Sequence, residues 1–168
     1  MNIEEAKTEF IQTWGSLGSA WGIPRSMAQI HALLLMSPGE LNTEEVMDTI
    51  QLSRGNVNIN LRELVNWRLV SKQNKLGERR EFFVANHDIW QIAQNIARER
   101  KEREFRPVQT LLMRLKNETI EGTPEEVAHF ETMVNDLHDF VSQLDQLSEL
   151  LVKINDNAFF KRMIKMVT

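Results

Sequence analysis

Apolar residues recur every three or four positions over residues 4–22 and 25–36, as they do along the buried face of a helix. The second segment is almost entirely apolar, so we expect it to form a central core helix. Gly15, Gly18 and Gly22 interrupt the first segment at a cost in helix propensity. These glycines would permit close packing against a partner subunit, or they would leave room for a ligand between subunits.

Two shorter helical patterns follow, over residues 43–50 and 53–68, with only two residues between them. The pattern then changes to strand formers, which predict a hairpin wing over residues 69–86. A helix, a short turn, a second helix and a hairpin are the outline of a winged helix-turn-helix. We therefore predict a mainly α fold with a small β-hairpin wing, in which residues 1–86 form a DNA-binding domain.

The rest of the chain, residues 87–168, is expected to be a helical linker and dimerisation arm. A long helix should cover residues 87–117, with a run of alternating charges that is typical of a solvated helix, and Pro107 should kink or reset it. A second long helix should cover residues 124–154, and a short amphipathic helix at 158–167 should follow a break. The apolar stripe of the second long helix fits antiparallel packing or contact between subunits.

The helix expected at residues 53–68 has an unusual polar face. Ser53 is a good N-cap, because its hydroxyl can accept hydrogen bonds from the free amides of the first turn. The face opposite the apolar positions carries Arg54, Asn56, Asn58, Asn60 and Arg62. Asn is a poor helix former, but Asn can bind an adenine edge and Arg a guanine edge in the major groove of DNA. The residues expected to read bases are Arg54, Asn56, Asn58 and Arg62.

The hairpin expected after this helix carries four basic residues, Lys72, Lys75, Arg79 and Arg80. A basic hairpin beside a reading helix can lie along the phosphates or enter the minor groove. The alternative is an ordinary charged hairpin tip. We expect these four residues, together with Ser53, to contact the DNA backbone. Gly55 would let a neighbouring helix or a phosphate come close, unless it is simply a tolerated glycine.

Charge is distributed unevenly along the chain, which bears on the expectation of DNA binding. The 168 residues carry a net charge of −4. Residues 1–50 hold two basic and seven acidic side chains, residues 51–106 hold twelve and seven, and residues 107–168 hold six and ten. The only basic block therefore contains the predicted reading helix and wing. A local basic patch attracts phosphate even on an acidic body, and a dimer doubles the patch.

The composition excludes several other classes of protein. The chain has no cysteine, which excludes disulfides, thiolate metal sites and a cysteine nucleophile. Its four histidines are scattered, and it has neither a glycine-rich phosphate loop nor a nucleophile elbow. We expect no enzyme activity, no cofactor and no metal. No apolar run approaches the ~20 residues of a membrane span, so we expect a cytoplasmic protein with no membrane partner.

The stretch LNTEEVMDTIQLSRGNVNINLRELVNWRLV, with the basic hairpin after it, resembles the winged helix regulators of the MarR type. The stretch FIQTWGSLGSAWGIPRSMAQIHALLLMSPGELNTEEV is more similar to the GbsR branch of that superfamily. The resemblance covers residues 5–105, and the rest of the chain is similar only in its helical, dimerising character. It implies a homodimeric bacterial transcription regulator, usually a repressor, and some members of the group respond to small molecules.

Two tryptophans offer a site for such an effector. Trp14 and Trp21 are two helical turns apart and should share one face. Two indoles can form part of a cage for a quaternary ammonium ligand, and the resemblance points to choline-like molecules. The alternative is that both are anchors in the core or in a dimer interface. His31 lies among apolar residues and is expected to be a hydrogen-bonded core or interface histidine.

Together these patterns predict a sequence-specific regulator that binds double-stranded DNA as a homodimer. The alternative is a winged-helix adaptor that contacts only other proteins. Such an adaptor should lack a basic wing and a polar reading face, and this sequence has both.

Overall fold

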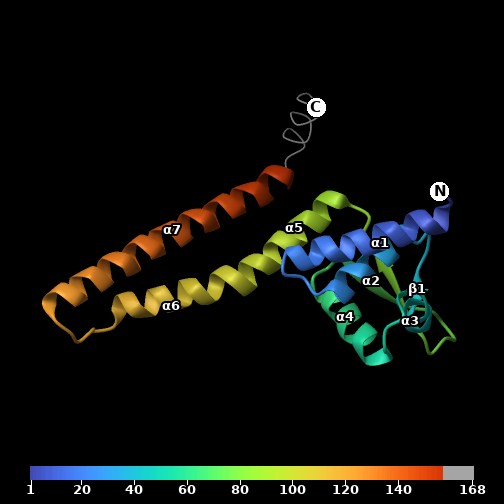
Figure 1. Cartoon of the computed structure of the whole chain (residues 1–168), viewed down its shortest axis with the longest axis horizontal. Coiled ribbons are helices and arrows are strands. Elements are labelled where there is room, and N and C mark those ends of the chain that lie inside the picture. The colour runs from blue at the N-terminus through green and yellow to red at the C-terminus, as the bar shows by residue number, and fades with distance from the viewer. Residues whose placement is uncertain (157–168) are drawn as a thin grey trace, which may run out of the picture. The chain divides into compact units, whose positions relative to one another are not determined.

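The computed structural model describes residues 1–156, with the side chains of residues 1–147 and of Glu149. The chain forms two compact units, Met1–Asn95 and Ile96–Thr168 (Figure 1). The terminal amphipathic helix expected at 158–167 lies outside the described residues. Among the residues described, no helix is both long enough and apolar enough to cross a bilayer.

The first unit begins with two helices that pack closely on each other. Helix α1 (Ile3–Ala20) starts with a capping box formed by Asn2 and Glu5, and α2 (Arg25–Met36) follows. A Cβ atom at Gly18 would lie 2.5 Å from the Cβ of Ala28, and one at Gly15 would lie 2.6 Å from Cγ of Gln29. These two glycines therefore serve the α1–α2 contact within the chain, which corrects the expected packing against a partner subunit.

Helix α2 is the centre of the first unit, as its composition predicts. It packs on α1, on α3 (Thr43–Ile50), on α4 (Arg54–Asn66) and on the sheet. The side chains that are almost fully enclosed come from three helices: Ile30 and Leu34 of α2, Val46 of α3, and Val57, Leu61 and Leu64 of α4. The helices of the helix-turn-helix are thus held against one another by a shared apolar core.

The wing belongs to a three-stranded antiparallel sheet with the order β1-β3-β2. Strands β2 (Val70–Asn74) and β3 (Glu81–Ala85) form the predicted hairpin, and the two-residue strand β1 (Leu41–Asn42) adds to its other edge. Phe83 of β3 pairs with Leu41 on one side and with Lys72 on the other. The sequence does not predict β1, because two residues are too few to show a strand period.

Helix α5 (Ile89–Arg100) begins in the first unit, and its last residues belong to the second. It is followed by a π-helical turn, η1 (Lys101–Phe105), and by α6 (Arg106–Asn117). Pro107 lies in the first turn of α6 and has no N–H to donate to the preceding turn. We predicted that the long helix would be interrupted near Pro107, and the π-helical turn just before this proline is that interruption.

In the second unit, α7 (Pro124–Asp156) packs on α6 and η1. Thr123 and Glu126 cap its start, with a hydrogen bond of 3.1 Å from the Thr123 amide to Oε2 of Glu126. Helix α7 continues through Asn155 and Asp156, two residues beyond its predicted end at 154. Lys101 of η1 holds two carboxylates of α7, at 2.8 Å from Asp145 Oδ1 and 3.0 Å from Glu149 Oε1.

Helix α7 has two apolar seams, and only one of them is covered within the described part of the chain. Val134 and Val141 are buried with Leu112 of α6. A second seam, spaced by three and four residues, faces solvent. Its large exposed members are Phe130, Met133, Leu137, Phe140 and Leu147. A helix with apolar residues on two faces resembles a bundle helix that lacks one neighbour.

Candidate nucleic-acid interface

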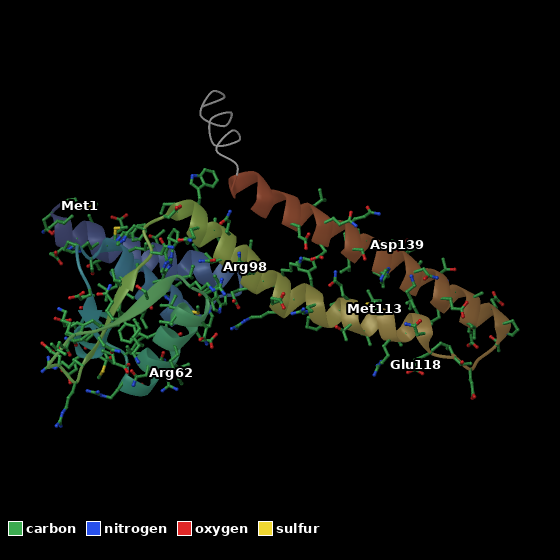
Figure 2. All side chains as sticks on the ribbon, turned by 180° about the vertical axis from the view of Figure 1, so that it is seen from behind. Met1, Arg62, Arg98, Met113, Glu118 and Asp139 are labelled. Carbon is green, nitrogen blue, oxygen red and sulfur yellow. The ribbon has the colours of Figure 1, made fainter. Side chains whose placement is uncertain are left out.

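Helix α4 (Arg54–Asn66) starts where the sequence predicts and ends two residues before the predicted end at 68, and Val57, Leu61 and Leu64 are buried as predicted. Ser53 is its N-cap and accepts a hydrogen bond from the amide of Asn56 at 3.4 Å. Arg54, Asn56 and Arg62 are exposed, and Asn58 is half-buried. The helix lies at the edge of the first unit in both views, and Arg62 is labelled on it in Figure 2.

The turn before α4 contains a residue in an unusual backbone conformation. Gln51 has φ 57° and ψ 44°, the left-handed region that favours glycine. Its amide donates to the carbonyl of Met47 at 2.8 Å, and its side chain amide donates to the carbonyl of Asp48. These bonds satisfy carbonyls at the end of α3 and fix the short turn from which α4 starts.

Gly55 lies in the first turn of α4 on an open surface. A Cβ atom built there would meet nothing within 4 Å among the described residues. The expectation that a neighbouring helix approaches Gly55 is therefore not met in the described part of the chain. The open space leaves the other expectation, the approach of a phosphate, as a prediction.

Asn60 is not on the exposed face of α4, where the helical pattern predicted it. Its side chain is only 7% exposed. Its Nδ2 atom lies 3.1 Å from Oγ of Ser26 on α2 and 2.9 Å from the carbonyl oxygen of Asn56. Asn60 therefore lies at the boundary between the core and the polar face, and a buried amide is stable there because its N–H groups have acceptors.

The cations expected to meet DNA are mostly paired with carboxylates of the same unit. Glu44 at the start of α3 pairs with Arg54, at 3.1 Å from its Nη2, and with Arg80, at 3.8 Å from its Nη1. Lys72 pairs with Glu81 across the hairpin. These pairs are exposed, and exposed pairs contribute little to stability, but they lower the net positive charge that the surface presents.

Lys75 is the most firmly held of these cations. Its Nζ pairs with Glu40 and lies 4.3 Å from the centre of the Phe82 ring. The hydrogen bond that Lys75 donates to Glu40 raises the pKa of Lys75, so the ammonium stays charged. Among the described residues, Arg62 and Arg79 make no ion pair, so these two cations can meet phosphate without losing a partner.

A polar cleft of about 260 Å³ lies between the start of α3, the start of α4 and the wing. It is lined by Asn42, Thr43, Glu44, Arg54, Asn58, Arg79, Arg80 and Glu81. The structure thus brings four of the predicted site residues, Arg54, Asn58, Arg79 and Arg80, to one cleft. The sequence did not identify Glu44 as the shared counter-charge of Arg54 and Arg80, because residues 44, 54 and 80 are distant in sequence and show no local pattern.

The two tryptophans of the predicted effector site lie in different surroundings. Trp14 is half-buried and stacks on Phe10 with ring centroids 5.4 Å apart, and its ring lies 6.4 Å from that of His31. Trp21 follows the last residue of α1 as its C-cap and is 52% exposed. Trp14 therefore has the packing of a core anchor, and a cage that contains both indoles stays a prediction.

His31 is a core histidine, as predicted, and its side chain is 3% exposed. We expected a hydrogen-bonded histidine, but its Nε2 atom has no hydrogen-bond partner among the described residues. Burial lowers the pKa of His31 to about 4, because the charged imidazolium would lose its hydration. In the described part of the chain, no group of three or more acidic or histidine side chains is arranged to hold a metal ion.

Comparison with known proteins shows the fold and not the family. No family model matches this chain, and no curated protein matches it. A solved structure of a transcriptional regulator is similar, with a TM-score of 0.67 and 16% identity over 90% of this chain and 99% of that chain. The chain has a mainly helical winged helix fold with a small three-stranded antiparallel sheet.

Proposed function

We propose that this protein is a sequence-specific DNA-binding regulator of transcription, and that it acts as a homodimeric repressor in the cytoplasm of a bacterium. The observation that carries the proposal is α4, in which Val57, Leu61 and Leu64 are buried in the core while three polar residues are exposed beside a basic wing: Arg54, Asn56 and Arg62. Polar residues near the N-terminus of such a helix are the ones that reach base edges in the major groove.

The basic charge of residues 51–106 supports the same proposal. Phosphate contacts supply most of the affinity for DNA and position the protein, whereas base contacts supply the specificity. Ser53, Lys72, Lys75, Arg79 and Arg80 are the proposed backbone contacts, and Arg54, Asn56, Asn58 and Arg62 are the proposed base contacts. The similar structure belongs to a transcriptional regulator, which agrees with this assignment.

The exposed apolar seam of α7 supports the proposed dimer. Contiguous exposed apolar residues mark interaction surfaces, and a dimer places two reading helices on two half-sites of one operator. Residues 1–86 are the proposed DNA-binding domain, and residues 87–168 are the proposed linker and dimerisation arm. The resemblance to the GbsR branch adds a small-molecule effector near Trp14 and Trp21 to the proposal.

Fluorescence anisotropy tests the proposal directly. The purified protein is titrated against a labelled duplex from upstream of its own gene and against a scrambled duplex, over a series of salt concentrations. We expect tighter binding to the upstream duplex and a marked loss of affinity as salt rises. Weak binding to both duplexes at every salt concentration would favour the adaptor alternative, in which the winged helix contacts only protein.

A further inference from the structure

Asn60 connects the core of the first unit to one of the proposed base-reading residues. Its Nδ2 atom lies 2.5 Å from Oδ1 of Asn56, besides its contacts with the Asn56 carbonyl at 2.9 Å and with Ser26 at 3.1 Å. Asn60 is buried, whereas Asn56, the third residue of α4, is exposed. The contact therefore joins a fixed side chain to one that faces solvent.

The chemistry of these contacts fixes the orientation of both amides. A backbone carbonyl can only accept, so the group of Asn60 that faces the Asn56 carbonyl must be its NH₂. That NH₂ also faces the side chain of Asn56, and only an oxygen can accept from it there. Asn56 therefore turns its Oδ1 inward toward Asn60. Because Oδ1 and Nδ2 branch from the same carbon, the NH₂ of Asn56 points away from Asn60.

This orientation changes what Asn56 can recognise. Asn normally binds adenine with two hydrogen bonds, by donating to N7 and accepting from the N6 amino group. Because the Oδ1 of Asn56 is turned inward toward Asn60, the group directed outward is the NH₂, which is a donor. Guanine presents two neighbouring acceptors, N7 and O6, in the major groove, whereas cytosine presents a donor.

We propose that Asn60 fixes Asn56 as a hydrogen-bond donor, so that Asn56 selects guanine rather than adenine at one position of the operator. The inference rests on the proposed DNA-binding function and specifies the base chemistry of one of its residues. Asn60 is a positioning residue, because it acts through Asn56. Ser26 extends the positioning to α2, since its hydroxyl also accepts from Asn60.

The test is selection of preferred sites from a randomised duplex pool by the full chain, followed by sequencing. The wild type should prefer guanine over adenine and cytosine at one position by about tenfold, the discrimination expected of a good base contact. Asn56→Asp should switch that position to cytosine, because a carboxylate can accept from Asn60 and also from the cytosine N4 amino group. The other positions should keep their preferences.

Asn60→Ala tests the positioning itself. Asn56 would then be free to rotate and bind adenine, so the preference for guanine over adenine at this position should fall from about tenfold to within about twofold. Thermal unfolding followed by circular dichroism checks that the variant is folded. If it is not, Ser26→Ala removes one acceptor of the same amide, and it should weaken the same preference in the same direction.

Asn66→Asp is the matched control, because it adds the same charge to the same helix at an exposed residue outside the proposed contacts. It should leave the guanine at the Asn56 position unchanged. A switch to cytosine with Asn66→Asp, or an equal loss of affinity for all sequences with Asn56→Asp, would overturn the inference. The second result would mean that Asn56 donates to a phosphate. A wild type that enriches no sequence would overturn the proposed function itself.

Discussion

His31 illustrates at the scale of one residue how burial without a partner makes stability depend on pH. The imidazole titrates near pH 6.5 in the unfolded chain and near pH 4 in the folded one, because burial lowers the pKa of the ring. Between these values the unfolded state binds a proton that the folded state does not bind. The part of the stability that depends on the neutral His31 ring is therefore fully present above about pH 6.5. It is lost as the pH falls from about 6.5 toward 4.

We expect His31→Leu to remove this part of the acid sensitivity. In the wild type, the free energy of unfolding should fall because of His31 by about 1.4 kcal/mol for each unit by which the pH drops within that window. Urea unfolding at pH 7.5, 6.0 and 5.0 measures the effect as the difference between the two proteins. His87→Gln is the control, since His87 is exposed. If the wild type and His31→Leu lose the same free energy of unfolding as the pH falls, the His31 ring is not the source of the acid sensitivity.

At the scale of elements, Glu44 joins the start of α3 to α4 and the wing. It pairs with Arg54 and Arg80, so DNA must separate these pairs before either guanidinium meets a phosphate or a base. We predict that Glu44→Gln binds all DNA sequences more tightly, by up to about fivefold, which is the range of an exposed ion pair. The slope of log affinity against log salt should steepen by about one.

The matched control for this prediction is Asp48→Asn, which removes the same charge from the exposed face of the same helix. A general effect of net charge would make both variants bind alike. Separation of the ion pairs would make Glu44→Gln bind more tightly than Asp48→Asn. Both variants are titrated by fluorescence anisotropy against the upstream and the scrambled duplex. If Glu44→Gln and Asp48→Asn bind DNA with equal affinity, the role given to Glu44 is contradicted.

The wing provides a second prediction at this scale. Arg79 has no ion-pair partner among the described residues, whereas Lys75 is held by Glu40 and by the Phe82 ring. A free cation can neutralise a phosphate without first losing a contact. Arg79→Ala should therefore reduce the salt slope by about one and weaken binding to every sequence.

Lys75→Ala, measured in the same anisotropy titrations, should weaken binding less than half as much as Arg79→Ala on the logarithmic scale. The two substitutions remove one positive charge each from the same hairpin, so each serves as the control for the other. The reverse order of the two losses would mean that DNA displaces Glu40 readily from Lys75.

The helices and the hairpin could be predicted because their signals are local. Asn42, Ser53 and Thr123 act as N-caps, and Gly77 has the positive φ that its turn requires. Cap residues and turn glycines determine structure within a few residues, so the sequence alone indicates where each element begins. The hairpin predicted over residues 69–86 contains both β2 and β3, which begin at Val70 and Glu81.

The features that could not be predicted depend on contacts that are distant in sequence. A helical pattern places Asn60 on the polar face, but its contact with Ser26, 34 residues earlier, makes it a buried residue. The pairs of Glu44 with Arg54 and Arg80 likewise follow from the packing of α3 against α4 and the sheet. The sequence identifies the predicted site residues by their type and their position on an element. Their hydrogen-bond and ion-pair partners are distant in sequence and are seen only in the folded structure.

At the scale of the whole molecule, the exposed seam of α7 determines the expected assembly. Leu137 is 52% exposed and Phe140 is 58% exposed near the middle of this seam. If a second copy covers the seam, a carboxylate placed there would lose its hydration without gaining a partner. We therefore expect Phe140→Asp to weaken the dimer by more than about a hundredfold and to produce a monomer at micromolar concentration.

Sedimentation velocity measures this change in assembly, and Asn135→Asp is the control, because it adds the same charge to an exposed polar position of α7. The monomer should still bind DNA through one reading helix, but its affinity for a two-half-site operator should fall by a factor of about 10² to 10⁴. If Phe140→Asp stays dimeric, the subunits meet elsewhere. If it becomes monomeric but binds the operator as tightly as the control, one reading helix is sufficient for recognition.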